Sequence, residues 1–435
     1  MRLHLHLILT LPTEPSSPIG PRYPEAMSRR LAPLRMELDF FPSPVEERPG
    51  LVVRDPYHYS DATLIIPPVF VQALALFDGE HTDLDLRQHL NELTGELQVS
   101  EMADHLGDIL GTSGFLHDDT FSALREKAWT NFAEAPVRSA AHAREGGYPE
   151  DPTELRKTFD EYLGGETSPG SPAGDPLIAI AAPHVSPFGG VESYRAAYRA
   201  LTPEHRDRTF VILGTSHYGA PDRLGLTRKD FVTPYGTART DRTLMEKLAR
   251  DAGASATMED YCHSFEHSIE FQVVFLQHLY GPEVKILPIL VGSYATSLMS
   301  GARPDAEDDV KRLLGAVSEL HASEGSKLCW ILGVDMSHIG ARYGDENQAE
   351  ANRGAMEEVA VRDAARIERL NAGDADGFWS LVQPNHDDLK WCGSAPFYTF
   401  LKAVPQARGT LRHYQQWNID EASVVSFAGI GFSAK

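Results

Sequence analysis

The sequence predicts an α/β protein in which a large sheet is flanked by helices, with a small α+β domain in front of it. Three observations support this prediction. From residue 177 onward, short apolar runs alternate with helical segments, as in sheets whose strands are buried on both faces. Before residue 120, the strands are few and the helices follow one another. The 435 residues are too many for one typical domain.

The first 44 residues are predicted to be disordered. Their apolar start, residues 1–11, is a poor signal peptide because His4 and His6 interrupt it and no small-residue cleavage site follows. Residues 121–136 are predicted to be a linker. Residues 164–176 are rich in Gly, Ser and Pro, which is typical of a loop.

Residues 45–120 are predicted to form a winged-helix-like domain. We expect strands at 51–53, 63–66 and 114–116 and a helix at 70–77, with Thr82 and Ser100 capping two further helices. This order resembles that of PqqD-like peptide-binding domains, which often have pairs similar to Arg54-Asp55 and Asp78-Gly79. A small helical accessory domain is an equally good interpretation.

Residues 137–435 are predicted to form the larger domain. After a helix at 153–163, it alternates buried strands with helices and ends in two strands. The expected strands are 177–182, 209–213, 284–291, 328–333, 410–416 and 423–432, and the expected helices are 191–201, 241–252, 266–279 and 305–320.

Composition excludes several classes of partner. The net charge of −22 argues against a nucleic-acid backbone or an anionic membrane, because both require a basic surface. No apolar run approaches the length of a transmembrane helix. The three widely spaced cysteines form no disulfide framework, which favours a reducing, cytoplasmic location.

A histidine follows the carboxyl end of three predicted strands. His184, His217 and His338 come after 177–182, 209–213 and 328–333. Ligands bind at this edge of open α/β sheets, and neutral imidazoles are common ligands of transition metals. One such histidine is more often an ordinary loop residue, but three in equivalent places predict a metal site.

Two further segments carry reactive side chains. In the segment from Glu266 to Glu270, one or two groups are expected at the rim of the site; the alternative is a solvated, charged first helical turn. Cys392 precedes a predicted helix at about 396–401, whose N-terminus stabilises a thiolate. Cys329, inside a predicted strand, fits burial as a small apolar residue.

Taken together, these motifs resemble the Memo family, which also supplies protein B of AmmeMemoRadiSam systems. The resemblance covers roughly residues 137–432. Its motifs are 147–152, the helix at Leu155, Pro183-His184, Gly190, 213–217, 233–236, Asp241, 266–270, 288–292, 335–340 and Cys392-Gly393.

The resemblance implies a fold similar to the class III extradiol dioxygenases, which use non-haem iron. It implies His184, His217 and Cys392 as ligands of iron or copper, with redox or dioxygenase-like chemistry. His338, with Asp335 beside it, matches a further site histidine that acts on protons, and Glu266 and His267 lie in another shared motif. Radical SAM and AMMECR-like proteins are the implied partners.

Other interpretations remain open. Family members commonly have Ala-Gly-Tyr after the first Pro-His, whereas this chain has Val-Ser-Pro-Phe at residues 185–188, which reshapes that loop. The domain could bind metal or a peptide without catalysis. His263 to His267 matches the HxxEH pattern of a zinc hydrolase, provided that one helix carries both histidines. A serine hydrolase is disfavoured because no GxSxG motif is present.

Overall fold

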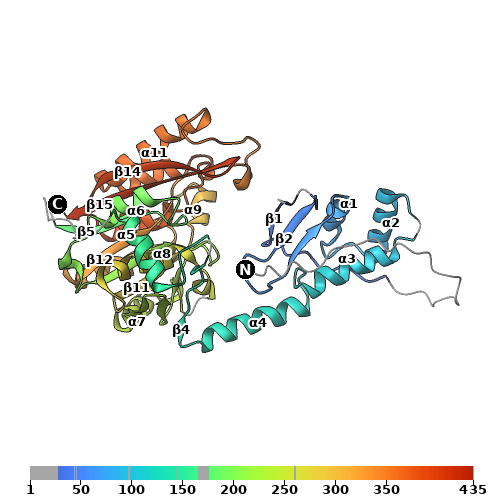
Figure 1. Cartoon of the computed structure of the whole chain (residues 1–435), viewed down its shortest axis with the longest axis horizontal. Coiled ribbons are helices and arrows are strands. Elements are labelled where there is room, and N and C mark those ends of the chain that lie inside the picture. Colours follow the sequence, from blue (N-terminus) through green and yellow to red (C-terminus); the bar gives the residue numbers. More distant parts are fainter. Residues whose placement is uncertain are drawn as a thin grey trace. The chain divides into compact units, whose positions relative to one another are not determined.

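The computed structural model describes residues 28–434, apart from 44, 46, 97, 145, 165–175 and 259–260. The expected disorder of residues 1–27 and most of the loop predicted at 164–176 therefore lie outside the described residues. Contacts divide the chain into two compact units with the boundary between Glu134 and Ala135, and each is described by itself. The predicted fold class is confirmed (Figure 1).

The first unit is a three-stranded antiparallel sheet with helices packed against it. Its sheet order is β1–β2–β3, and its apolar core includes Val53, Leu90, Leu106 and Phe115. The elements are β1 (Asp39–Pro42), β2 (Leu51–Arg54), β3 (Thr63–Ile66), α1 (Pro68–Val71), α2 (Asp83–Thr94), α3 (Ser100–Thr112) and α4 (Asp119–Glu134).

Residues 28–43, which we expected to be disordered, are ordered by burial. Leu31, Leu34 and Leu38 lie in the core. The fully buried Arg35 guanidinium donates to both carboxylate oxygens of Asp55, at 3.0 and 3.1 Å. A buried charge needs such a partner, so this ion pair fixes the segment against the sheet.

Several local expectations in this unit need correction. Thr82 caps α2 in a capping box as predicted, but Ser100 is the first residue of α3 and Val99 is its N-cap. The expected helix at 70–77 is divided into α1 and a 3-10 helix, and Leu116 makes only an isolated bridge, to Leu34. The expected linker is largely helix α4, anchored by the buried Phe121 and Phe132. The PqqD-like resemblance stays a prediction.

The second unit contains a large mixed sheet in the order β13–β15–β5–β12–β6–β11–β9–β8–β4, with β14 beside β15 and with β7 and β10 joined through β11. Its strands are β4 (Val137–Arg138), β5 (Leu177–Ala182), β6 (Thr209–Thr215), β7 (Leu224–Leu226), β8 (Asp230–Thr233), β9 (Gly236–Thr240), β10 (Ala256–Met258), β11 (Lys285–Val291), β12 (Leu328–Gly333), β13 (His338–Gly340), β14 (Ala407–Asp420) and β15 (Ser423–Ala434).

Alternating side chains of the central strands enter two separate cores, so the sheet is covered on both faces. In β12, Trp330 belongs to one core, whereas Cys329 and Ile331 belong to the other. The burial of Cys329 confirms its predicted structural character. The helices of this unit are α5 (Pro152–Tyr162), α6 (Val191–Tyr198), α7 (Arg242–Ala252), α8 (His267–Tyr280), α9 (Ala295–Ser300), α10 (Asp308–Glu324), α11 (Ala355–Ala372), α12 (Ala375–Val382) and α13 (Ser394–Ala403).

Strands β5, β12 and β6 are adjacent and parallel, so their carboxyl ends meet at one edge. Gly333 is paired with both Ala182 and Gly214. The three chains therefore leave the sheet side by side, and the residues that follow must lie close together. No described helix is long and apolar enough to span a membrane.

Candidate metal centre

His184 leaves the end of β5 and turns back into the molecule. Its side chain is buried, at 2% exposure. Nδ1 contacts the Gly333 carbonyl at 2.9 Å, so in the neutral imidazole Nδ1 carries the proton and donates it. Nε2 then carries a lone pair, and it faces Cys392 and Asp335. This is the arrangement expected of a metal-binding imidazole whose orientation is fixed by a backbone acceptor.

His217 follows β6, and Glu266 holds it in place. The Glu266 carboxylate accepts from the backbone N–H of His217 at 3.0 Å and lies 3.1 Å from Nδ1. Burial acts to lower the pKa of His217, but the Glu266 carboxylate and Cys392 together outweigh it and raise that pKa well above its usual value. A metal at Nε2 would therefore compete with a proton.

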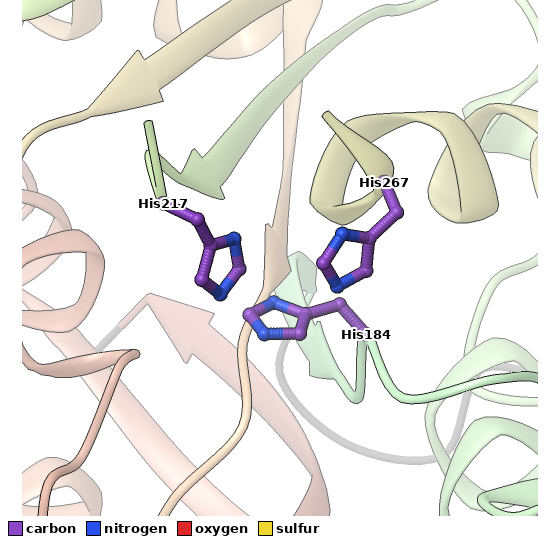
Figure 2. A group of neighbouring side chains, drawn as sticks. All are labelled: His184, His217 and His267. Atoms are coloured by element: carbon purple, nitrogen blue, oxygen red, sulfur yellow. The ribbon is translucent and has the colours of Figure 1, made fainter. Parts of the chain in front are cut away.

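His267 is the first residue of α8, and its imidazole joins the other two. Figure 2 shows the rings of His184, His217 and His267 gathered around one small volume, from three different elements. One ligand atom from each lies within 4.8 Å of the others. Burial holds the pKa of His267 well below its usual value, so this ring is neutral and suited to metal binding.

Cys392 completes the cluster. It lies in a turn directly before α13, and its Sγ is 3.3 Å from His184 Nε2. Burial acts to raise the pKa of Cys392, but contacts with His184 and His217 outweigh this effect and lower the pKa below its usual value. The structure thus brings His184, His217 and Cys392 together, and places His267 beside them.

Asp335 and His338 follow β12 at the same edge. The Asp335 carboxylate accepts from the backbone N–H of His184 at 2.9 Å, and its second oxygen lies 3.4 Å from His184 Nε2. Burial raises the pKa of Asp335 to about 6. His338 Nδ1 lies 2.9 and 3.0 Å from the carbonyls of Met336 and Lys390, so in the neutral ring Nε2 is the unprotonated atom.

His263 takes no part in this cluster. It lies in a 3-10 turn, Tyr261–Ser264, whereas α8 begins only at His267 with Glu266 as its N-cap. Its Nε2 contacts the Gly225 carbonyl at 2.9 Å. The HxxEH interpretation needs both histidines on one helix, so the structure contradicts it.

A buried network that sequence reasoning missed supports the α8 side of the cluster. Glu270 is fully buried and contacts Arg138, Tyr148 and His142. The His142 ring centroid lies 5.7 Å from that of His267. Arg138 precedes Glu270 by 132 residues, so no local spacing links them. The charged pattern of residues 266–270 was the only sequence signal.

Fold and site together define a class: α/β proteins with a cluster of histidines and a cysteine at the carboxyl ends of the parallel central strands of a mixed sheet. The Memo family profile, described as Memo-like protein, matches residues 138–431, which is more than half of the chain. The chain belongs to the Memo family.

Relatives of known family support this assignment. A MEMO1 family protein of Aquifex aeolicus is 26% identical over 385 residues, covering 88% of this chain and 95% of the relative. This alignment is longer than the stretch from residue 138 to the C-terminus, so it extends into the first unit. A MEMO1 family protein of Pyrococcus horikoshii is 31% identical over 283 residues, covering 61% of this chain and 88% of the relative. The similarity to extradiol dioxygenases stays a prediction.

Proposed function

We propose that this protein binds iron or copper through His184, His217 and Cys392 and uses the metal in redox chemistry of the dioxygenase type. The observation that carries the proposal is the 3.3 Å approach of Cys392 Sγ to His184 Nε2 beside two further imidazoles. Imidazole suits iron and copper, and a thiolate favours copper(I), zinc or iron. Three ligands from the chain would leave a position open for water or substrate, as in catalytic metal sites.

The residues around the cluster have separable tasks in this proposal. When bound, the metal supplies redox and Lewis-acid chemistry. His184 and His217 present Nε2, because Gly333 and Glu266 occupy their Nδ1 atoms. His338 accepts a proton at Nε2, since its Nδ1 contacts backbone carbonyls.

The site is reachable from solvent on one side. The His217 and His267 side chains are 27% and 28% exposed, whereas His184 is buried. A small substrate would therefore approach over His217 and His267, with His184 and Asp335 forming the floor. Asp335, with its pKa near 6, can hold a proton close to neutral pH beside His184.

Anaerobic metal analysis of the wild type beside a His184→Ala, Cys392→Ser double variant tests the proposal. We expect near-stoichiometric iron or copper in the wild type alone, followed by oxygen consumption with a subset of screened substrates. Equal or absent metal in both proteins would refute the site. Metal without oxygen consumption for any substrate would refute the catalytic part and favour a metal-binding module.

A further inference from the structure

A further buried carboxylate, that of Asp363, has no role in the proposal above. Asp363 of α11 is fully buried and accepts four hydrogen bonds. Its Oδ1 receives Ser337 Oγ at 2.6 Å and Trp391 Nε1 at 2.7 Å. Its Oδ2 receives Tyr414 OH at 2.7 Å and Ser426 Oγ at 2.6 Å. Such a carboxylate is costly to bury unless its acceptor capacity is used.

The two oxygens serve different parts of the fold. Oδ2 faces strands β14 and β15, which carry Tyr414 and Ser426. Oδ1 faces two loops at the cluster. Ser337 lies between Asp335 and His338, and Trp391 immediately precedes Cys392. One carboxylate oxygen therefore contacts both loops: the loop that carries Asp335 and His338, and the loop that carries Cys392.

These loops are also held by strands β15 and β6. The Met336 N–H donates to the Ser426 carbonyl at 2.8 Å, and Thr215 Oγ1 donates to the Cys392 carbonyl at 3.1 Å. Trp391 Nε1 also contacts Ser337 Oγ at 3.0 Å, and the Gly393 N–H donates to the Asp335 carbonyl at 3.1 Å. The Trp391 N–H donates to Asp387, which Arg366 of α11 contacts at 2.8 Å. The loops are thus joined to each other, and α11 contacts both of them in addition to their hydrogen bonds with β15 and β6.

We propose that Asp363 is a positioning residue that sets the place of Cys392 relative to His184 by joining the 334–338 and 387–393 loops to one anchored carboxylate. The inference rests on the proposed metal site, which gives Cys392 its role. Asp363 touches neither the metal ligands nor a substrate. It acts through Trp391 and Ser337, as partners of metal ligands commonly do.

The choice of substitution follows from the donors. Trp391 Nε1–H can only donate, whereas the hydroxyls on the Oδ2 side can also accept. Asparagine at 363 can therefore keep an oxygen towards Trp391 and turn its amide towards Tyr414 and Ser426. Leucine has a similar shape but no acceptor, so Asp363→Leu should release the loops and Asp363→Asn should preserve them.

The test compares these two variants with the wild type and with Tyr414→Phe, which removes a donor on the strand side only. Hydrogen exchange is followed in peptides 334–340 and 387–393, with 215–219 and 264–270 as references. Asp363→Leu should accelerate exchange in the first pair by at least about tenfold and leave the references unchanged. Asp363→Asn and Tyr414→Phe should behave like the wild type in all four peptides.

Cobalt(II), added anaerobically, reports on the cysteine. Asp363→Leu should weaken cobalt binding by about 10–100-fold and reduce the thiolate-to-cobalt absorption per bound ion, and Asp363→Asn should restore both. A purely structural role would lower thermal stability without changing the absorption per bound ion. That result, or equal acceleration of all four peptides, would overturn the inference.

The test also covers a variant that does not fold and a wild type that binds no cobalt. If Asp363→Leu does not fold, Trp391→Phe replaces it, and faster exchange of 387–393 in Trp391→Phe than in Tyr414→Phe supports the inference, whereas equal exchange overturns it. If the wild type binds no cobalt, the proposed metal site fails, and the exchange data alone decide whether Asp363 orders the two loops.

Discussion

The Sγ atom of Cys392 lies 3.3 Å from Nε2 of His184, although 208 residues separate them in the sequence. The contact depends on two chain segments that reach the same sheet edge. His184 follows β5, and the turn containing Cys392 is fixed there by the Cys392 carbonyl, which accepts from Thr215 Oγ1 at the end of β6 at 3.1 Å. The position of the Cys392 thiol therefore depends on the parallel alignment of the central strands β5 and β6.

Replacing this sulfur should discriminate between metals. We expect Cys392→Ser to weaken copper(I) binding by at least about 100-fold, because a hydroxyl is a poor ligand for a soft ion. Mutating a residue that only hydrogen-bonds a metal ligand already lowers metal affinity by about 10–100-fold, so loss of a ligand itself should cost more. Nickel(II), which imidazole suits, should still bind through the three histidines. Competition with chromophoric chelators measures both affinities. Cys262→Ala, outside the cluster, is the control, and a copper(I) affinity equal to wild type in Cys392→Ser would contradict the ligand assignment.

Removing the charge of Glu266 should weaken the site without removing a ligand. Glu266→Gln keeps an acceptor but loses the carboxylate that orients His217, so we expect a 10–100-fold loss of metal affinity. Asp151→Asn is a matched control, since Asp151 is also a helix N-cap and makes no contact with the cluster. Isothermal titration of both variants makes the comparison. Equal affinities in the two would mean that the Glu266 charge is only a helix cap.

The sequence predicted the central strands well because burial on both faces leaves a clear signal. The expected bounds of 177–182 and 328–333 coincide with β5 and β12. Once these strands and β6 are known to be adjacent, the meeting of His184 and His217 follows from their positions. The segment at 266–270 carries His267, which lies in the histidine cluster. The contact of Glu266 with His217 and the buried network around Glu270 were not foreseen.

What could not be predicted depends on contacts between distant residues. Arg138 pairs with Glu270, and Asp363 accepts from donors in two loops and two strands. Neither arrangement leaves a periodic pattern in the sequence. Residues 28–43 were misjudged because their ordering depends on the Arg35 to Asp55 ion pair rather than on local propensity. The HxxEH match at His263 depends on where helix α8 begins. The exact start of a helix is weakly determined by the local sequence.

The buried pair of Glu270 and Arg138 should dominate acid sensitivity. Burial acts to raise the pKa of Glu270, but Arg138, His142 and Tyr148 together outweigh it and hold that pKa well below its usual range. Because the pKa of Glu270 is lower in the folded state, its ionisation stabilises the fold at pH values above the unfolded-state pKa of 4.5. This stability is lost as the pH falls from 4.5 towards the folded-state pKa.

Glu270→Gln tests this linkage. At pH 7 it should cost about 3–5 kcal/mol, because Arg138 is left buried without its partner. Below pH 4.5 the wild type should lose about 1.4 kcal/mol per pH unit more than the variant, so the two stabilities converge. Urea unfolding between pH 7 and 3.5 measures this difference. Parallel pH profiles would show that Glu270 does not titrate as described.

The boundary at residue 135 predicts how the chain can be divided. A fragment of residues 135–435 keeps Arg138, His142 and Tyr148 around Glu270, so it should fold and bind metal with the stoichiometry of the full chain. A fragment of residues 151–435 lacks all three partners and should be destabilised by several kcal/mol, on the order of a buried unpaired charge. Thermal melting and metal titration of the two fragments compare them. Equal stability would mean that the network is dispensable.

The close approach of α8 to the sheet depends on Gly333. A Cβ at this position would lie 2.2 Å from the Ser268 carbonyl oxygen, which belongs to the first turn of α8. Backbone cannot yield as a side chain does, so Gly333→Ala must push the start of α8 away from β12. We expect a loss of about 1–3 kcal/mol in unfolding free energy, as for other overpacked cores. His267 and Glu266 would move with the helix, so metal affinity should fall as well.

Gly315 provides the control for this substitution. It lies within helix α10, and apart from its chain neighbours and the adjacent helix backbone no atom lies within 4 Å of where its Cβ would be. Gly315→Ala should therefore stabilise the protein by about 0.5–1 kcal/mol through helix propensity and leave the metal site unchanged. Urea unfolding and metal titration of both variants separate the two effects. If Gly333→Ala lowered stability but kept wild-type metal affinity, the position of α8 would not govern the geometry of the cluster, and His267 would have to be regarded as a bystander.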